Sequence, residues 1–178
     1  VAPTVPAVTD LSLCSSDSAI FNAFGAGGTI SWYDAPVSGN LLATGPVYNA
    51  GLLAAGITVV YASEGNGLCG SGLSPAIATV YANPVAPIIT PDTICAGEGA
   101  SLSVNATSGV FNWYSDATLT ALVFVGNSFT TPILSANTTY YVTEVNNNNC
   151  ASPATQVDVV VNGLPANPTV SNDTICQG

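Results

Sequence analysis

Five cysteines carry most of the covalent chemistry that this chain could perform, and four of them form two pairs with the same internal spacing. Cys69 follows Cys14 at the same sequence spacing, 55, at which Cys150 follows Cys95. Cysteines at repeated spacings indicate a disulfide framework. The shared spacing therefore predicts two disulfides, Cys14 with Cys69 and Cys95 with Cys150, and it leaves Cys176 without a partner in this sequence.

The charged residues limit every other kind of chemistry. The chain has ten Asp plus Glu and no Lys, Arg or His. A Ser or Cys nucleophile needs His or Lys as its base, and a phosphoryl or oxyanion site needs a cationic group. Nucleic acids and anionic membranes are bound mainly through Lys and Arg. We therefore expect no catalytic residues, no cofactor, no nucleic-acid partner and no direct membrane insertion.

The carboxylates themselves offer two further sites, and neither is supported. Asp92 and Glu98 are the nearest pair within one unit for glycoside hydrolysis, but Leu11 and Asp17 stand at the equivalent positions of the first unit. Calcium is the metal that suits these oxygen ligands, yet the carboxylates are scattered and form no Asp-x-Asp-x-Asp cluster. We interpret them as surface charge and expect no metal site.

The sequence repeats itself with a period of 81, so that a shift by one period superposes its landmarks. The matching positions include three cysteines, both Trp-Tyr pairs and two glycines: Cys14, Cys95 and Cys176, Trp32-Tyr33 and Trp113-Tyr114, Gly45 and Gly126. Self-similarity at a fixed period is typical of repeat arrays. We expect a first repeat at residues 1–82, a second at 83–163, and the first strand of a third at 164–178.

The cysteine usage and the termini indicate where the protein works. Regularly spaced disulfides belong to an oxidising compartment, so we expect a secreted or surface-exposed protein. The chain has no signal peptide and no methionine, and its longest apolar stretch, residues 52–62, is too short to span a bilayer. We interpret the sequence as a mature protein or a piece of one.

Each repeat contains alternating apolar residues in short runs separated by turn signals. A Pro-rich extended segment opens each unit, and six further strands follow, at residues 3–13, 19–23, 29–33, 41–42, from 48, 58–61 and 77–81, and at 84–94, 100–104, 110–114, 122–125, from 129, 139–142 and 156–161. Seven short strands without an amphipathic helix are typical of a β-sandwich. The predicted fold is all-β, with tandem immunoglobulin-like sandwiches of about 81 residues.

These residues also resemble a known group of domains. The resemblance is carried by the Cys before the second strand, Trp-Tyr on the third, Thr-Tyr-Tyr-Val at 139–142, the Cys after it and the Pro-rich start of the next unit. Together they resemble the immunoglobulin-like repeats of very large cell-surface proteins of Bacteroidota, including gliding-associated adhesins exported by the type IX system. The resemblance implies an extracellular, adhesive and non-catalytic role.

The cysteines are placed differently from those of antibody domains. There the second Cys sits within a strand, whereas Cys150 follows a polar run at 146–149. We therefore expect both cysteines of a unit to lie at one end, clamping the turn between the first two strands to the loop between the last two. Trp32 and Trp113 would then fill the middle of the core with their large apolar area.

Short modification signals occur in both units. An Asp, then Ser or Thr, then a small or aliphatic residue resembles the O-glycosylation signal of Bacteroidota, and it predicts glycans on Ser18, Thr93 and Thr174. The competing interpretation is a turn before the Cys, formed by Asp and a hydroxyl residue. The signal for N-linked glycans also occurs, at Asn105, Asn137 and Asn172. In a bacterial protein that signal usually goes unread, so we expect any glycan to be on the hydroxyl sites rather than on these asparagines.

Two functions remain after these exclusions. The leading hypothesis is a structural or adhesive array forming an extracellular stalk or filament, whose partners are neighbouring repeats, other copies in a fibre and O-linked glycans. The rival is a carbohydrate-binding or accessory module pair of a secreted enzyme, which a row of exposed aromatic residues would favour. Tyr48 and Phe129 instead occupy repeat-equivalent strand positions that suit a core.

The final segment, 163–178, repeats the segment 82–97 in type. It is either the first strand of a third domain, whose second cysteine lies as far beyond Cys176 as Cys69 lies beyond Cys14, or a tail that adds a strand to a neighbouring subunit. The first unit already has its own first strand at residues 3–13, so we favour continuation of the array. This predicts a native polypeptide much longer than 178 residues.

Overall fold

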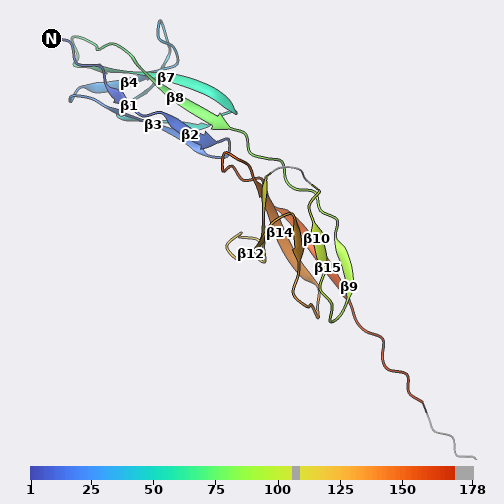
Figure 1. The fold of residues 1–178 in the computed structure, drawn as a ribbon. Coiled ribbons are helices and arrows are strands. Elements are labelled where there is room, and N and C mark those ends of the chain that lie inside the picture. Colours follow the sequence, from blue (N-terminus) through green and yellow to red (C-terminus); the bar gives the residue numbers. More distant parts are fainter. Residues whose placement is uncertain (106–108, 171–178) are drawn as a thin grey trace, which may run out of the picture. The chain divides into compact units, whose positions relative to one another are not determined.

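A computed structural model describes residues 1–105 and 109–170 of the chain. Within this part the secondary structure is all β, and the prediction of an all-β fold is confirmed (Figure 1). The chain forms two compact units. The first contains Val1–Val85 together with Val145–Ser152, and the second contains Ala86–Glu144 and the residues from Pro153 onward. The loop at 145–152 thus belongs to the first unit although it comes from the second sequence repeat.

The first unit is a sandwich of two sheets. One has three strands, in the order β1 (Ala7–Val8), β3 (Ser18–Phe24) and β6 (Val47–Leu52). The other has five, in the order β2 (Leu11–Cys14), β8 (Ser74–Tyr81), β7 (Gly56–Gly65), β4 (Thr29–Tyr33) and β5 (Leu41–Thr44). The described pairs are antiparallel except β2 with β8, which is parallel.

The second unit repeats this arrangement with a smaller first sheet. That sheet pairs β10 (Ser101–Ser103) with β13 (Ser128–Thr130). The five-stranded sheet has the order β12 (Leu122–Val125), β11 (Val110–Tyr114), β14 (Thr138–Val145), β15 (Thr155–Asn162) and β9 (Asp92–Cys95). Here too the pairing between the last and first strands, β15 and β9, is parallel.

Each sandwich is built around one tryptophan. Trp32 on β4 is fully buried, with its ring centroid 6.1 Å from those of both Phe21 and Tyr48. Trp113 on β11 is also fully buried, 5.5 Å from Phe129 between ring centroids. Alternation along the strands produces this result, since every second side chain faces the opposite sheet. The rings give each unit an apolar core of its own.

The opening segment of the first repeat forms two strands rather than the single strand that we expected. β1 pairs with β3 in the small sheet, and β2 pairs with β8 in the large one. The chain crosses between the sheets at Thr9 and Asp10. The carboxylate of Asp10 accepts the backbone N–H of Ile77 at 2.9 Å, so it ties the crossing point to β8.

The 81-residue period aligns β14 with β7, but in the structure the two strands correspond with a shift of one residue. Val60 on β7 pairs with Ala76, and its structural equivalent on β14 is Tyr140, which pairs with Val157. Ala76 and Val157 occupy the same position of the repeat, whereas Tyr140 comes one position before the sequence equivalent of Val60. The connection before β14 is one residue shorter and the loop after it one residue longer, so the spacing of the cysteines is unchanged.

The predicted disulfide pairing is wrong. Cys14 is bonded to Cys150, while Cys69 and Cys95 are free. The parallel pairing of β2 with β8 explains why: Cys14 lies opposite Tyr81, at the end of β8, whereas Cys69 lies in the loop before β8 begins. An eight-residue strand spans about 23 Å, far beyond the Cα separation of about 4.4–6.8 Å that a disulfide tolerates.

The same reason excludes the second predicted disulfide. Cys95 lies opposite Asn162, at the end of β15, whereas Cys150 precedes the start of that strand at Thr155. The two cysteines of one repeat therefore lie at opposite ends of its larger sheet. Cys176 falls outside the described residues.

Candidate functional site

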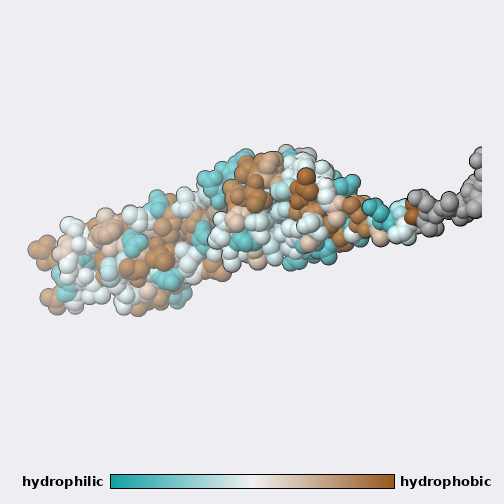
Figure 2. Space-filling model, turned by 90° about the horizontal axis from the view of Figure 1, so that it is seen from below, coloured by the Kyte–Doolittle hydropathy of each residue, from teal (hydrophilic) through white to brown (hydrophobic). Residues whose placement is uncertain are grey.

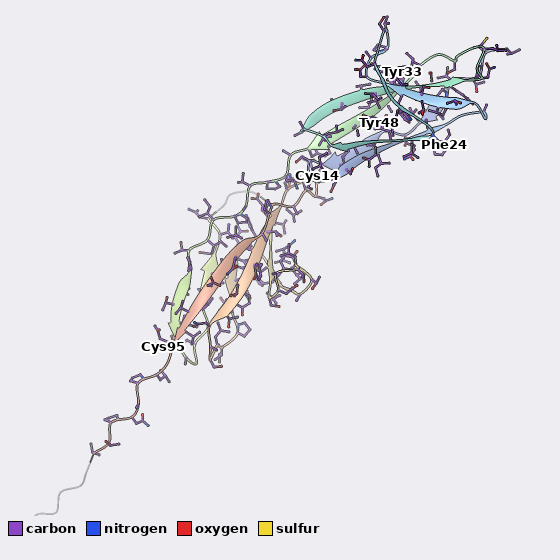
Figure 3. The ribbon with its side chains drawn as sticks, turned by 180° about the vertical axis from the view of Figure 1, so that it is seen from behind. Cys14, Phe24, Tyr33, Tyr48 and Cys95 are labelled. Atoms are coloured by element: carbon purple, nitrogen blue, oxygen red, sulfur yellow. A yellow bond between two sulfur atoms is a disulfide. The ribbon has the colours of Figure 1, made fainter. Side chains whose placement is uncertain are left out.

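The disulfide joins two segments 136 residues apart in the sequence, with 5.5 Å between its Cα atoms. Cys14 ends β2 and lies at the end of the first unit's ribbon (Figure 3). A tight turn holds it there, because Asp17 accepts the N–H of Cys14 through its carboxylate at 3.1 Å and donates its own N–H to the Cys14 carbonyl at 2.9 Å. The bonded sulfur of Cys14 is thus held by a backbone turn that the Asp17 side chain fixes.

The other half of the bond comes from a loop organised by Asn146. Its Oδ1 accepts the N–H groups of both Asn148 and Cys150 at 3.0 Å. Its Nδ2 donates to the backbone carbonyl of Ala82 at 3.0 Å. One side chain therefore shapes the loop and attaches it to the segment that follows β8.

Asn83 adds a second set of hydrogen bonds to the same place. Its Oδ1 accepts the hydroxyl of Ser15 at 2.7 Å and the N–H of Ser16 at 3.2 Å. Its Nδ2 donates to the carbonyl of Ala151 at 2.6 Å and to the Ser16 hydroxyl at 3.1 Å. The turn after β2, the exit from β8 and the 145–152 loop are consequently joined by polar contacts as well as by the disulfide.

Asn83 and Asn146 were not among the residues predicted to be functional from the sequence. The sequence does contain a feature that could have indicated the loop-forming asparagine. An Asn precedes the cysteine in both loops, at residue 66 before Cys69 and at residue 146 before Cys150. Asn side chains that accept N–H groups two to four residues later are common in tight loops.

Glu64 is a buried carboxylate that was not among the residues predicted to be functional either. Its side chain is 1 % exposed on β7, among the Gly-rich residues that precede β4. The carboxylate accepts the N–H of Ala26 at 2.8 Å and the N–H of Gly28, and these hydrogen bonds lower the pKa of Glu64 below its usual range. The close approach needs glycine, because a Cβ at position 28 would lie 2.6 Å from the Gly65 carbonyl oxygen.

The remaining carboxylates with a shifted pKa are fixed in local hydrogen bonds. Bonds from neighbouring side chains and backbone lower the pKa of Asp34, Asp116 and Asp158, each from its usual value. Their partners lie in the same turns or, for Asp158, on the paired strand β14 through Thr139. These groups stabilise turns and edges of the fold.

The carboxylates considered for hydrolysis or metal binding have structural partners as well. Asp92 accepts the N–H groups of Thr93 at 2.8 Å and Ser101 at 3.3 Å, and Glu98 accepts the N–H of Cys95 at 3.2 Å. Across residues 1–105 and 109–170, no three His, Cys, Asp or Glu side chains gather as a metal site would require.

The predicted glycosylation positions fall on exposed strands where they are described. Ser18 begins β3, and its hydroxyl donates to Asn49 at 3.0 Å. Thr93 is exposed on β9, an edge strand of the second unit's larger sheet. Thr174 lies outside the described residues. Modification of these hydroxyls stays a prediction.

The asparagines of the N-glycan signal lie partly within the described chain. Asn105 is exposed, and Asn137 accepts the N–H of Val161 at 2.7 Å. Asn172 lies outside the described residues. The described part of the chain also holds no helix long and apolar enough to span a membrane.

Solved structures similar to this chain contain tandem β-sandwich domains at low sequence identity. The fibronectin(III)-like modules of Clostridium thermocellum CbhA are 11% identical, with a TM-score of 0.47, over 93% of this chain and 100% of that one. The Ig1-2 module of Drosophila receptor protein tyrosine phosphatase DLAR is 14% identical, with a TM-score of 0.32, over 89% of this chain and 96% of that one.

A third similar structure also contains immunoglobulin domains, and one sequence family matches both repeats of the chain. The N-terminal four Ig domains of Dscam1 match with 10% identity and a TM-score of 0.34, over 91% of this chain and 47% of that one. No curated protein sequence matches the chain. The sequence model of the family described as "Ig-like domain CHU_C associated" matches twice, at residues 2–81 and 84–162. With both sandwiches matched over almost their whole length, the chain belongs to this family of immunoglobulin-like domains.

Proposed function

We propose that the protein is a structural or adhesive segment of an extracellular surface protein, a stalk or filament built from immunoglobulin-like repeats and without catalytic activity. The observation that carries the proposal is the Cys14–Cys150 disulfide, which joins residues of two successive sequence repeats. A covalent tie between neighbouring repeats suits a protein that has to keep its repeats together outside the cell.

The chemistry of the side chains supports a passive role. Each carboxylate considered for catalysis is engaged by backbone N–H groups, and the sequence provides no Lys, Arg or His to act as a base or to stabilise an anion. Membership in the CHU_C-associated family agrees with the resemblance to Bacteroidota surface adhesins, so we extend the proposal to a type IX substrate that carries O-linked glycans.

Exposed apolar strands suit association between copies in a fibre. β12 is an edge strand whose four side chains, Leu122, Val123, Phe124 and Val125, are between 38% and 53% exposed. Edge strands with exposed apolar residues are prone to pair with other chains. Figure 2 shows hydrophobic residues in several separate patches on the visible face, with polar residues between them.

The rival function, carbohydrate binding, finds less support. Phe24 on β3 is 65% exposed and could stack on a sugar ring, but its repeat equivalent is Asn105. The other aromatic landmarks, Trp32 and Trp113, are fully buried. The exposed ring of the second repeat, Phe124 on β12, stands where the first repeat has Ala43, so the two repeats do not share an exposed aromatic position.

Electron microscopy of the native protein, with labelling of intact cells, tests the proposal. We expect antibodies against this segment to label unpermeabilised cells, and the purified protein to be a fibre of beaded domains. A compact particle carrying a catalytic domain, or labelling that requires permeabilisation, would overturn it. Binding of the 178-residue chain to a polysaccharide panel with loss in Phe24→Ala would instead establish the rival function.

A further inference from the structure

Cys95 is held in a copy of the turn that presents Cys14. Each cysteine ends the strand that pairs in parallel with the last strand of its repeat. The N–H of Cys14 donates to the Asp17 carboxylate at 3.1 Å, and the N–H of Cys95 donates to the Glu98 carboxylate at 3.2 Å. The acidic residue also returns its own N–H to the cysteine carbonyl in both turns. Cys95 is therefore prepared for a bond in the same way as Cys14.

Cys69 is held in a copy of the loop that presents Cys150. Asn66 Oδ1 accepts the N–H of Cys69 at 2.9 Å, as Asn146 Oδ1 accepts that of Cys150 at 3.0 Å. The N–H of each Asn donates to the carbonyl of its cysteine, at 3.1 and 3.0 Å. The same loop thus occurs in the first repeat with its thiol unbonded.

The contact between this loop and the chain that enters the repeat is also repeated. Asn66 Nδ2 donates to the carbonyl of Val1 at 3.1 Å, and Asn146 Nδ2 donates to the carbonyl of Ala82 at 3.0 Å. Val1 and Ala82 are separated by one full period and so are equivalent. In the second case the segment comes directly from β8, whose partner strand carries the bonded Cys14. The first loop is attached to the corresponding segment in the same way.

The two loops differ in what covers the thiol. Cys150 is fully buried against the Cys14 turn, whereas Cys69 and Cys95 are both exposed. We propose that Cys69 and Cys95 are docking points for further copies of this repeat. Cys95 bonds the loop cysteine of the following repeat, and Cys69 bonds the turn cysteine of the preceding one. The inference rests on the proposed repeat array, and it assigns to that array a continuous series of staggered disulfides.

The chemistry of each new bond is an ordinary thiol oxidation. Two cysteine thiols lose two protons and two electrons and form one S–S bond, while a disulfide oxidant such as oxidised glutathione is reduced to two thiols. The repeat fixes which thiols meet, since the bonded pair is separated by 136 residues, one period of 81 plus the cysteine spacing of 55. Cys95 is thus expected to bond a cysteine at position 231 of a longer array.

The polar contacts of Asn83 are not repeated at the next junction. Leu164 stands at its equivalent position, and Ala96 and Gly97 replace the two serines that Asn83 contacts. The junction at Cys95 therefore relies on the disulfide and on the Asn-centred loop of the incoming repeat. We expect that disulfide to matter more for holding the repeats together than the one at Cys14.

A duplicated chain tests the proposal directly. Residues 1–162 followed by a second copy of residues 1–178 place Val1 of the second copy where Gly163 stands, and Cys69 of the second copy becomes residue 231. The chain is refolded in a glutathione redox buffer, digested with Asp-N and chymotrypsin without reduction, and mapped by mass spectrometry. We expect a peptide pair that links Cys95 of the first copy to Cys69 of the second.

Two controls accompany the map. In the single 178-residue chain, a maleimide added to the folded protein should label Cys69 and Cys95 but not Cys14 or Cys150. In the duplicated chain, Cys95→Ser in the first copy should remove the linked pair and leave Cys69 of the second copy open to labelling. Asn66→Ala in the second copy keeps every thiol and should lower the yield of the link.

A map that pairs Cys95 with Cys150, or Cys69 with Cys14 of its own repeat, would overturn the proposal. A link that forms between separate molecules and disappears on dilution would overturn it as well. These outcomes leave the proposed function standing, since a surface array can exist without staggered bonds. Conversely, the duplicated chain could give the expected Cys95–Cys69 link while electron microscopy shows that the native protein is not a fibre. That combination would reject the proposed function and leave the staggered disulfides standing.

Discussion

Glu64 is a carboxylate that the fold buries and surrounds with backbone donors rather than with a counterion. Because these donors bind the charged form, the pKa of Glu64 is lowered in the folded state from the value of 4.5 expected for the unfolded chain. The resulting stabilisation is fully present above the unfolded pKa, and it is lost as the pH falls through the folded pKa.

Glu64→Gln should therefore lower the melting temperature of the first unit at pH 7, because an amide NH₂ would face a backbone donor that now meets an oxygen. The difference from the parent chain should shrink as the pH falls below 4.5. Thermal unfolding followed by circular dichroism between pH 7 and pH 3 measures both effects. A difference that stays constant over this range would show that the carboxylate charge contributes nothing.

Trp113 is the residue whose loss should cost the second unit most. Its buried ring packs on Phe129, and its Nε1 donates to the Gly126 carbonyl at 2.9 Å. Trp113→Ala should lower the free energy of unfolding by about 3–5 kcal/mol, and Trp113→Phe by less because most of the apolar contact remains. Guanidinium titration measures the change, and Tyr114→Ala, which removes a half-buried ring on the same strand, serves as the control. Equal losses for Tyr114→Ala and Trp113→Ala would contradict this account.

At the scale of elements, the 145–152 loop depends on one side chain. Asn146→Ala removes the acceptor for two backbone N–H groups and the donor to Ala82. We expect local opening to become easier by about 1–3 kcal/mol, with faster hydrogen exchange at the amides of Asn148 and Cys150. Asn148→Ala is the matched control, because Asn146 receives the backbone N–H of Asn148. Exchange unchanged in Asn146→Ala would show that the disulfide alone orders the loop.

The bounds of individual strands could be predicted from the sequence more accurately than the pairing of those strands into sheets. The strands at 29–33, 110–114 and 122–125 have the predicted bounds, because local alternation and turn residues define them. The split of the opening segment, the one-residue shift of β14 and the direction of β2 relative to β8 depend on pairings between distant residues. The cysteine pairing failed for the same reason, since a spacing of 55 and one of 136 are equally compatible with a repeat period of 81.

For the whole molecule, the disulfide closes a covalent loop that includes residues of both sequence repeats. Its loop of 136 residues restricts the unfolded chain, which is worth about 5 kcal/mol in the chain-entropy model. Replacing both Cys14 and Cys150 by Ser should therefore destabilise the first unit by several kcal/mol in calorimetry. Cys69→Ser, at an exposed free thiol, should leave the transition unchanged. The same should hold for Cys95→Ala in this chain, contrary to what pairing within the repeat would imply.

The parallel pairing of β2 with β8, and of β9 with β15, also determines how each unit responds to tension. A pull on the chain before β2 and after β8 moves these two strands in opposite directions along their length. The hydrogen bonds between them are then loaded together, in shear, and cannot be opened one after another as in a peeled hairpin. Forced unfolding is governed by the rate of barrier crossing rather than by equilibrium stability. Once the Cys14–Cys150 disulfide is reduced, each sandwich is therefore arranged to resist stretching at this pair of strands. While the bond is intact, a load that enters along β2 passes through it directly to the 145–152 loop.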